Sequence, residues 1–228
     1  LKKIYRSKAR DNAVTTDGLK ITVFSDVPRV KPDAVLSAQH GSEGIGLIRM
    51  EGMYMAPQKP SETKIVTDAV DVANAIDGYL TFRLLDMQPD KLNDMIAIKD
   101  AVEKEKKADG TIYEGVPFYF ETKIGNEIVR HDMRALMIAY AKAEKKNIRM
   151  LIPNIENELQ AQQLKDLFEE IKRDILADAS LHIAAADLEG MPILAMIESP
   201  QACLSVKEIL KTGLFSGISF GTNDLSRR

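Results

Sequence analysis

Two arginines, one glutamate and one aspartate each end a short apolar run, and these are the residues of the sequence best suited to chemistry. The runs are residues 44–49, 79–83, 193–198 and 218–224, which end on Arg49, Arg83, Glu198 and Asp224. An arginine binds a phosphate or a carboxylate through two parallel hydrogen bonds. Mg²⁺ takes one or two carboxylates, with water and substrate oxygens as its other ligands. Gathered in one place, these side chains would bind a phosphorylated acid together with a divalent cation.

The same runs predict the elements that would gather these side chains. Short, continuously apolar runs are typical of strands buried on both faces of a parallel sheet. In such sheets ligands bind at the carboxyl ends of the strands, which is where the runs carry their polar residues. Lys91 follows Arg83 in a polar loop, where it could serve as a point charge on phosphate or simply be a solvated loop lysine.

Each of these arginines and carboxylates, considered alone, could also have a purely structural role. Each arginine could form an ion pair at the rim of the sheet, for example with Glu51 or Asp86. Asp224 stands in a run of good N-cap residues, and Glu198 precedes a serine and a proline at which a helix could begin. The arrival of both carboxylates at strand ends, together with two arginines, favours a functional site over these simpler roles.

Strand-like and helix-like segments alternate along the chain. The pattern predicts strands at 19–24, 44–49, 79–83, 148–153, 193–198 and 215–221, a weaker strand at 116–121, and helices at 30–41, 61–76, 126–145, 158–177 and 201–212. This alternation predicts an α/β fold with a parallel sheet. We expect a (β/α)8 TIM-type barrel that lacks its last strand in this chain, although a doubly wound sheet obeys the same rule.

A turn signal at Asp17-Gly18 predicts the domain organisation. We expect residues 1–18 to be a linker or an N-terminal extension, and residues 19–228 to be the partial barrel domain. The highly charged segment 101–110 is expected to be a solvated helix or a surface loop.

Composition excludes several classes of function. The formal net charge of −3 offers no basic field for nucleic acid. We found no apolar run long enough to span a membrane, and the first residues lack the pattern of a signal peptide. The single cysteine, Cys203, fits a reducing compartment, so we expect a cytoplasmic protein in which this thiol is packed and inert.

Other candidate residues are interpreted as structural. His40, His131 and His182 do not fall on the predicted strand ends, so we expect them in structural or surface positions. Gly44 and Gly46 lie within a strand-like run and lack the third glycine of a dinucleotide-binding loop, which indicates close packing rather than nucleotide binding.

Five motifs of the sequence resemble, in the same order, the C-terminal PEP-binding barrel of the phosphoenolpyruvate (PEP)-utilising enzymes. They are Gly44-Ile-Gly-Leu-Ile-Arg-Met-Glu51, Arg83-Leu-Leu-Asp-Met-Gln-Pro-Asp-Lys91, Arg149-Met-Leu-Ile-Pro153, Met196-Ile-Glu-Ser-Pro200 and Phe220-Gly-Thr-Asn-Asp-Leu225. The resemblance is greatest to Enzyme I of the sugar phosphotransferase system, a phosphoenolpyruvate-protein phosphotransferase.

The resemblance implies a role for each candidate residue. The catalytic arginines would be Arg49 and Arg83, substrate binding would involve these two with Lys91 and Asn223, and the Mg²⁺ ligands would be Glu198 and Asp224. It further implies that the phosphoryl group of PEP passes to a histidine of a separate phosphohistidine domain or phosphocarrier protein, leaving pyruvate. A homodimer is also implied. Such catalysis depends mostly on positioning and on charge neutralisation.

The sequence departs from the family pattern at several places. Met50 replaces a threonine, Gln88-Pro89 replaces two glycines, and the arginine of the fourth strand is absent near residues 115–118. The last strand with its cysteine and the phosphohistidine domain are also not found in this chain, so we do not expect the chain alone to complete a phosphoryl transfer. Two alternatives follow: a catalytically silent paralogue that acts as a binding or regulatory module, or the barrel of a pyruvate phosphate dikinase or PEP synthase.

Overall fold

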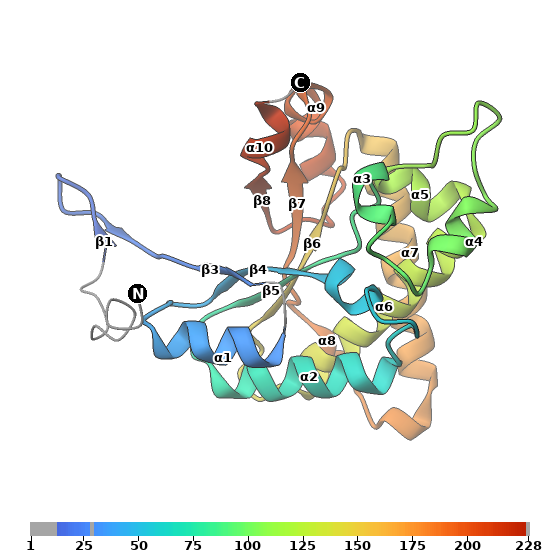
Figure 1. Cartoon of the computed structure of the whole chain (residues 1–228). Coiled ribbons are helices and arrows are strands. Elements are labelled where there is room, and N and C mark those ends of the chain that lie inside the picture. The colour runs from blue at the N-terminus through green and yellow to red at the C-terminus, as the bar shows by residue number, and fades with distance from the viewer. Residues whose placement is uncertain (1–12, 28–29, 227–228) are drawn as a thin grey trace.

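The computed structural model describes residues 13–27 and 30–226, and its centre is one curled sheet of six parallel strands (Figure 1). In sheet order the strands are β3 (Ser25–Val27), β4 (Ile45–Arg49), β5 (Leu80–Arg83), β6 (Ile148–Ile152), β7 (Ile193–Ile197) and β8 (Gly217–Phe220). Each strand pairs in parallel with the next along the chain. Strands β3 to β5 run across the view whereas β7 stands nearly upright. The fold is therefore α/β and forms a partial TIM-type barrel, as predicted.

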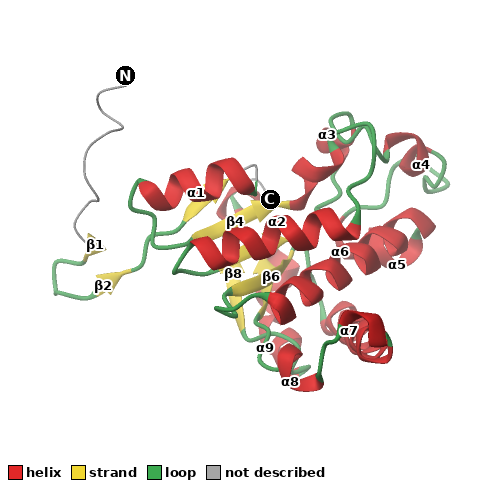
Figure 2. Ribbon diagram, turned by 90° about the horizontal axis from the view of Figure 1, so that it is seen from below, coloured by secondary structure: helices red, strands yellow, loops and turns green. Residues whose placement is uncertain are grey.

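Five longer helices connect and cover the strands (Figure 2). They are α1 (Lys31–Gln39), α2 (Glu62–Ala75), α6 (Lys123–Lys142), α7 (Glu158–Ala177) and α9 (Pro200–Lys211). Helices α2, α7 and α9 begin within one residue of their predicted starts, whereas α6 begins three residues before its predicted start at 126. The N-cap residues of these four helices each accept a backbone hydrogen bond from the first turn; they are Ser61, Thr122, Asn157 and Ser199. Helix α2 packs against both α1 and α6. None of the helices within residues 13–27 and 30–226 is long and apolar enough to cross a membrane.

Short helices lie mainly in the loops at the carboxyl ends of the strands. They are η2 (Met50–Tyr54), α3 (Pro89–Leu92), α4 (Lys99–Glu103), α5 (Gly115–Glu121), η3 (Ala179–Leu181), α8 (Ala185–Leu188) and α10 (Thr222–Leu225). Of these, η2 follows β4, α3 follows β5, and α10 follows β8. The charged segment 101–110 is the end of α4 and a loop, in agreement with the sequence.

The predicted strand at 19–24 is wrong in its extent and partner. Only Lys20–Ile21 (β2) is a strand there, and it pairs antiparallel with Ala13–Val14 (β1) in a hairpin that projects away from the body (Figure 2). The turn signal closes this hairpin, because Gly18 adopts φ +91° and its N–H donates to the Thr15 carbonyl. The sheet begins instead at Ser25. The boundary expected at residue 19 thus falls within the hairpin, and residues 1–12 of the expected extension lie outside the described residues.

The predicted strand at 116–121 is also wrong, because this segment is helix α5. Gly115 turns the chain with φ +58°, and the proline that follows lies in the first helical turn, where a missing N–H costs nothing. Phe118 and Tyr119 are buried together, and the Tyr119 hydroxyl donates to the Leu85 carbonyl at 2.6 Å. A short apolar run fits a buried helix as well as a strand, and here packing against α6 and the chain that follows β5 decided between them.

Gly78 connects α2 to β5 at a point where no side chain fits. A Cβ at this position would lie 1.8 Å from the backbone oxygen of Glu43. We expect Gly78→Ala to lower the free energy of unfolding by about 3 kcal/mol, because backbone must move to relieve the clash. Gly217→Ala is the control, since its Cβ would meet only the end of the Leu194 side chain at 3.1 Å. Equal urea midpoints for the two variants would contradict this expectation.

Candidate functional site

The carboxyl ends of strands β4 to β8 bring together most of the polar residues that the sequence singled out. Arg83 ends β5, Glu198 follows β7, and Asp224 lies in α10 after β8. The charges of Arg83 and Asp224 are both close enough to Glu198 to shift its pKa. The predicted meeting of an arginine and two carboxylates at one rim of the sheet is therefore what the structure shows.

Arg83 is the buried cation of this rim. Its side chain is 7% exposed, and its Nη2 donates to Oε1 of Glu51 at 2.5 Å while Nη1 lies 3.5 Å from Oδ2 of Asp86. Burial alone would lower the arginine pKa, but the charges of Glu51 and Asp86 more than offset it and the pKa is raised. The ion pairs that the sequence suggested for this arginine are thus present, and Arg83 stays charged.

Asp86 links Arg83 to the lysine of the following loop. The ammonium of Lys91 forms an ion pair with Asp86 Oδ2 and lies 3.7 Å from Glu51 Oε1. Gln88, which stands where the resembling family has glycine, donates from Nε2 to the same Asp86 oxygen at 3.1 Å. Two cations and two carboxylates therefore alternate beside the end of β5.

Arg49 lies at the end of β4, opposite Arg83 in the parallel pairing, but it has a different environment. Its side chain is half exposed and its Nη2 donates to Oδ2 of Asp26 at 2.7 Å, with Asp26 also half exposed. The ion-pair partner that the sequence suggested, Glu51 or Asp86, is therefore not the one found. An exposed pair of this kind contributes little to stability, so Arg49 can exchange Asp26 for an anionic ligand at small cost.

Glu198 is a buried carboxyl held by one backbone donor. Its Oε1 accepts the N–H of Asn154 at 2.7 Å, and its Oε2 has no hydrogen-bond partner among the described residues. The pKa of Glu198 is raised to about 7, mainly by burial and to a smaller extent by the charges of Asp86 and Asp224, against the lowering by the Asn154 N–H and by Arg83. Glu198 is thus poised between its neutral and charged forms near neutral pH.

The surroundings of Glu198 Oε2 fit a hard divalent cation. Gly221 lies beside it, and a Cβ there would stand 2.6 Å from this oxygen. Asp224 is the second carboxylate near enough to affect it. Within residues 13–27 and 30–226 no group of three or more histidine, cysteine, aspartate or glutamate side chains could hold a metal. A Mg²⁺ ion held by these two carboxylates would therefore need water and substrate oxygens as its remaining ligands, which is its ordinary habit. Asn223 lies exposed in α10, next to Asp224.

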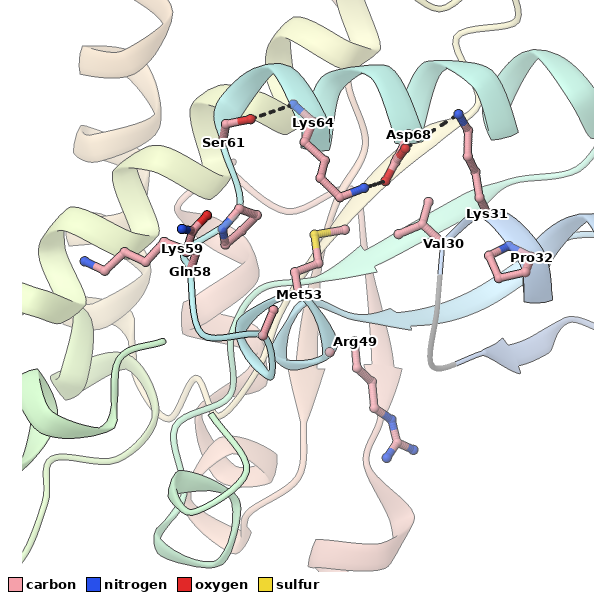
Figure 3. A pocket seen from close by; sticks show the side chains of 13 residues that line it. Val30, Lys31, Pro32, Arg49, Met53, Gln58, Lys59, Ser61, Lys64 and Asp68 are labelled. Atoms are coloured by element: carbon pink, nitrogen blue, oxygen red, sulfur yellow. Dashed lines mark hydrogen bonds and ion pairs between the residues drawn. The ribbon is translucent and has the colours of Figure 1, made fainter. Parts of the chain in front are cut away.

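A cavity of about 620 Å³ lies beside this rim, beneath the first turns of α2 (Figure 3). Lys31 and Lys64 line it, and both pair with Asp68 there, at 3.6 and 2.7 Å. Arg49 also lines the cavity but points away from these lysines. Glu198 and Arg83 are not among its lining residues. This cavity is therefore separate from the rim site, apart from the shared Arg49.

Two expectations about single residues have different outcomes. Cys203 is exposed in the first turn of α9, so the prediction of a packed thiol is wrong. His131 has a structural contact, as expected: its Nδ1 lies 3.0 Å from the buried Asp132, which also accepts a hydrogen bond from the Tyr54 hydroxyl at 2.7 Å.

Sequence reasoning missed Asp26 and Asn154. Asp26 lies in β3, which the predicted strand boundary placed outside the sheet. Asn154 follows the proline that ends the β6 run and adopts φ +47°, a backbone conformation in which asparagine is enriched. An asparagine directly after a strand-ending proline was the available signal.

The family comparison agrees with this geometry. Residues 2–227 match the family of the PEP-utilising enzyme, PEP-binding domain. The chain therefore belongs to the PEP-utilising enzymes. Several of its relatives are named phosphotransferases.

Three curated relatives show the range of the family. The chain is 26% identical over 217 residues to the phosphoenolpyruvate-protein phosphotransferase of Haemophilus influenzae, covering 94% of this chain and 34% of that protein. It is 28% identical over 222 residues to the multiphosphoryl transfer protein of Rhodobacter capsulatus, covering 94% and 23%. It is 24% identical over 252 residues to the pyruvate, phosphate dikinase of Giardia intestinalis, covering 92% and 27%. The chain thus spans about a quarter to a third of the length of these relatives.

Proposed function

We propose that this chain binds PEP together with Mg²⁺ and forms the part of a phosphotransferase from which the phosphoryl group passes to a protein histidine. The observation that carries the proposal is the rim at which buried Arg83 and buried Glu198 lie within electrostatic reach of each other. Relatives named phosphoenolpyruvate-protein phosphotransferase support the choice of substrate and reaction. The resembling family supports a phosphohistidine domain or phosphocarrier protein as acceptor, a homodimer, and work in the cytoplasm as part of sugar transport.

The charges of the rim support a requirement for the metal. Two cations face four carboxylates there: Arg83 and Lys91 against Glu51, Asp86, Glu198 and Asp224. PEP is itself an anion, so this rim would repel it unless a divalent cation neutralised part of the negative charge. We therefore expect PEP and the metal to bind together and each to strengthen the binding of the other.

Each residue of the rim has a role that its surroundings allow. Glu198 and Asp224 would hold Mg²⁺, which when bound supplies a positive charge that draws electrons from the transferring phosphoryl group. Arg83, with a buried Nε that has no partner among the described residues, would bind an anionic group of PEP from the floor of the site. Arg49 and Lys91 would close on it from the exposed side, because both side chains reach solvent.

Calorimetry of the full-length protein with PEP, in the presence and absence of MgCl₂, tests the proposal. We expect binding that weakens at least tenfold when EDTA removes the metal. Arg49→Ala should weaken PEP binding by about 10-fold, the usual worth of a hydrogen bond to a charged group, with little change in stability. Asp26→Asn is the matched control, since it removes the partner of Arg49 and leaves the arginine in place. The absence of any heat of PEP binding in the wild type would contradict the proposal.

One observation favours a silent paralogue as a second candidate. Arg49, Arg83 and Lys91 each already have a carboxylate partner, so no cation of the described site is left unpaired for an anionic substrate. Such a module would bind PEP weakly or not at all and would transfer no phosphoryl group. A phosphorylation assay of the full-length protein with ³²P-labelled PEP separates the two: an enzyme becomes labelled on its acceptor histidine or labels an added phosphocarrier protein, and a silent module does neither. The dikinase alternative predicts labelling from ATP as well.

A further inference from the structure

A single residue connects the two halves of the rim. Asn154 follows β6, and β6 lies between β5 and β7 in the sheet. Its side-chain Nδ2 donates to Oδ1 of Asp86 at 2.6 Å, while its backbone N–H donates to Oε1 of Glu198 at 2.7 Å. The residue after the middle strand can thus reach the carboxylate that follows each neighbouring strand. Asn154 lies outside the motifs that indicated the family, the nearest of which ends at Pro153.

The backbone of Asn154 is held in an unusual conformation that makes both contacts possible. Its φ of +47° lies in the left-handed region, which costs most side chains free energy and which asparagine and glycine tolerate best. Gly115 packs against it so closely that a Cβ on Gly115 would lie 2.8 Å from the Asn154 Cβ. The absence of a side chain at Gly115 therefore leaves room for Asn154 in its left-handed conformation.

The two hydrogen bonds have different consequences for the site. The backbone donor occupies Oε1 of Glu198, which leaves Oε2 as the oxygen available to a ligand. The side-chain donor occupies Oδ1 of Asp86, while Oδ2 of that carboxylate faces Lys91 and Arg83. One donor thus orients the carboxylate assigned to the metal, and the other orients the carboxylate that holds the cations assigned to the substrate.

We propose that Asn154 is a positioning residue that acts on substrate binding through Asp86 with its side chain and on metal binding through Glu198 with its backbone N–H. The inference rests on the proposed function and adds to it a physical link between the metal-binding and anion-binding parts of the site. It predicts that the two effects can be separated by substitution, because one belongs to the side chain and the other to the backbone conformation.

Two substitutions separate the two effects. Asn154→Gly tolerates the positive φ, so it should keep the backbone contact with Glu198 and lose only the contact with Asp86. We expect its affinity for Mg²⁺ alone to stay within about twofold and its affinity for PEP with Mg²⁺ to fall about 10-fold. Asn154→Ala is strained at this φ, so its N–H should turn away from Glu198. The affinity of this variant for Mg²⁺ alone should also fall about 10-fold.

Calorimetry with MgCl₂ alone, and then with PEP and MgCl₂, measures both effects in the full-length protein. If Asn154 were merely structural, both variants would bind Mg²⁺ and PEP more weakly by the same factor, and that result would overturn the inference. Unchanged PEP affinity in Asn154→Gly would overturn it as well. In the double variant Asn154→Gly/Asp86→Ala, PEP affinity should be no lower than in Asp86→Ala alone, because the alanine already removes the oxygen that accepts the Asn154 hydrogen bond.

A failure of the proposed function gives a distinct result. If the wild type binds Mg²⁺ but not PEP, the contrast between the glycine and alanine variants in Mg²⁺ affinity still decides the inference about Asn154. If the wild type binds neither ligand, the urea midpoints of Asn154→Gly, Asp86→Ala and the double variant decide it. Additive shifts would then overturn the link to Asp86, and non-additive shifts would support it.

Discussion

Replacement of Glu198 by glutamine is expected to weaken Mg²⁺ binding by about 100-fold or more and to abolish metal-dependent binding of PEP. Glutamine keeps the size of the side chain and an oxygen that can accept the Asn154 N–H, but it removes the negative charge that a divalent cation needs. Loss of a residue that only orients a metal ligand typically lowers metal affinity about 10–100-fold. Loss of a ligand itself should lower the affinity at least as much. Glu169→Gln, at an exposed position of α7, is the control. Calorimetry with MgCl₂ measures the difference, and wild-type affinity in Glu198→Gln would contradict the assignment.

The same substitution should change how stability depends on pH in metal-free protein. Burial raises the pKa of Glu198 from 4.5 to about 7, so between these values the folded state binds more protons than the unfolded state. Stability from this group is therefore fully present below pH 4.5 and is lost as pH rises through about 7. We expect the wild type to lose thermal stability over this window, Glu198→Gln to lose less, and MgCl₂ at pH 8 to restore the wild type alone. Thermal unfolding between pH 5 and 8 checks this, and parallel pH profiles for the two proteins would refute it.

Replacement of Arg83 by alanine is expected to destabilise the fold by about 3–5 kcal/mol, because it leaves buried Glu51 without its closest counter-charge and removes one of the two cations beside buried Asp86. It should also abolish PEP binding, but a misfolded protein would do the same. A second variant separates the two effects. In Arg83→Met/Glu51→Met both partners of the closest ion pair become apolar, and such replacements often recover stability.

The double variant Arg83→Met/Glu51→Met should therefore unfold closer to the wild-type urea concentration than Arg83→Ala and yet fail to bind PEP. Arg83→Lys provides the conservative comparison, since lysine keeps the charge but lacks the planar pair of donors. We expect it to fold and to bind PEP about 10-fold more weakly, the usual worth of a hydrogen bond to a charged group. Wild-type PEP affinity in the stable double variant would show that Arg83 serves only the fold.

Much of the fold was predictable because its signals are local. An apolar run followed by a polar residue identified β4, β5, β7 and β8, and cap residues such as Ser61 identified the helices between them. The errors came from segments whose local signal fits two structures. Residues 116–121 are apolar enough for a strand or a buried helix, and the alternation at 19–24 belongs to a projecting hairpin whose apolar side chains Leu19, Ile21 and Val23 remain exposed.

The candidate site divides in a similar way. The positions of Arg49, Arg83, Glu198 and Asp224 near strand ends could be read from the sequence, since the first three end an apolar run and Asp224 stands in the polar stretch that follows one. Their partners could not. Asp26 pairs with Arg49, and Asn154 donates to two carboxylates. These partners lie far apart in the sequence, and only the order of the strands in the sheet brings them together.

By itself, then, the sequence determined which chemical groups stand at the ends of the strands, because an apolar run and the polar residue after it are neighbours in the chain. Tertiary structure decided the charge state of each group and the partner with which it pairs. The charges of Glu51 and Asp86 keep the buried Arg83 charged, while exposure lets Arg49 exchange its partner at small cost. Burial likewise brings the pKa of Glu198 to about 7. Charge state and partner depend on the solvent and charges around a side chain, and the strand order and packing of the whole sheet set these surroundings.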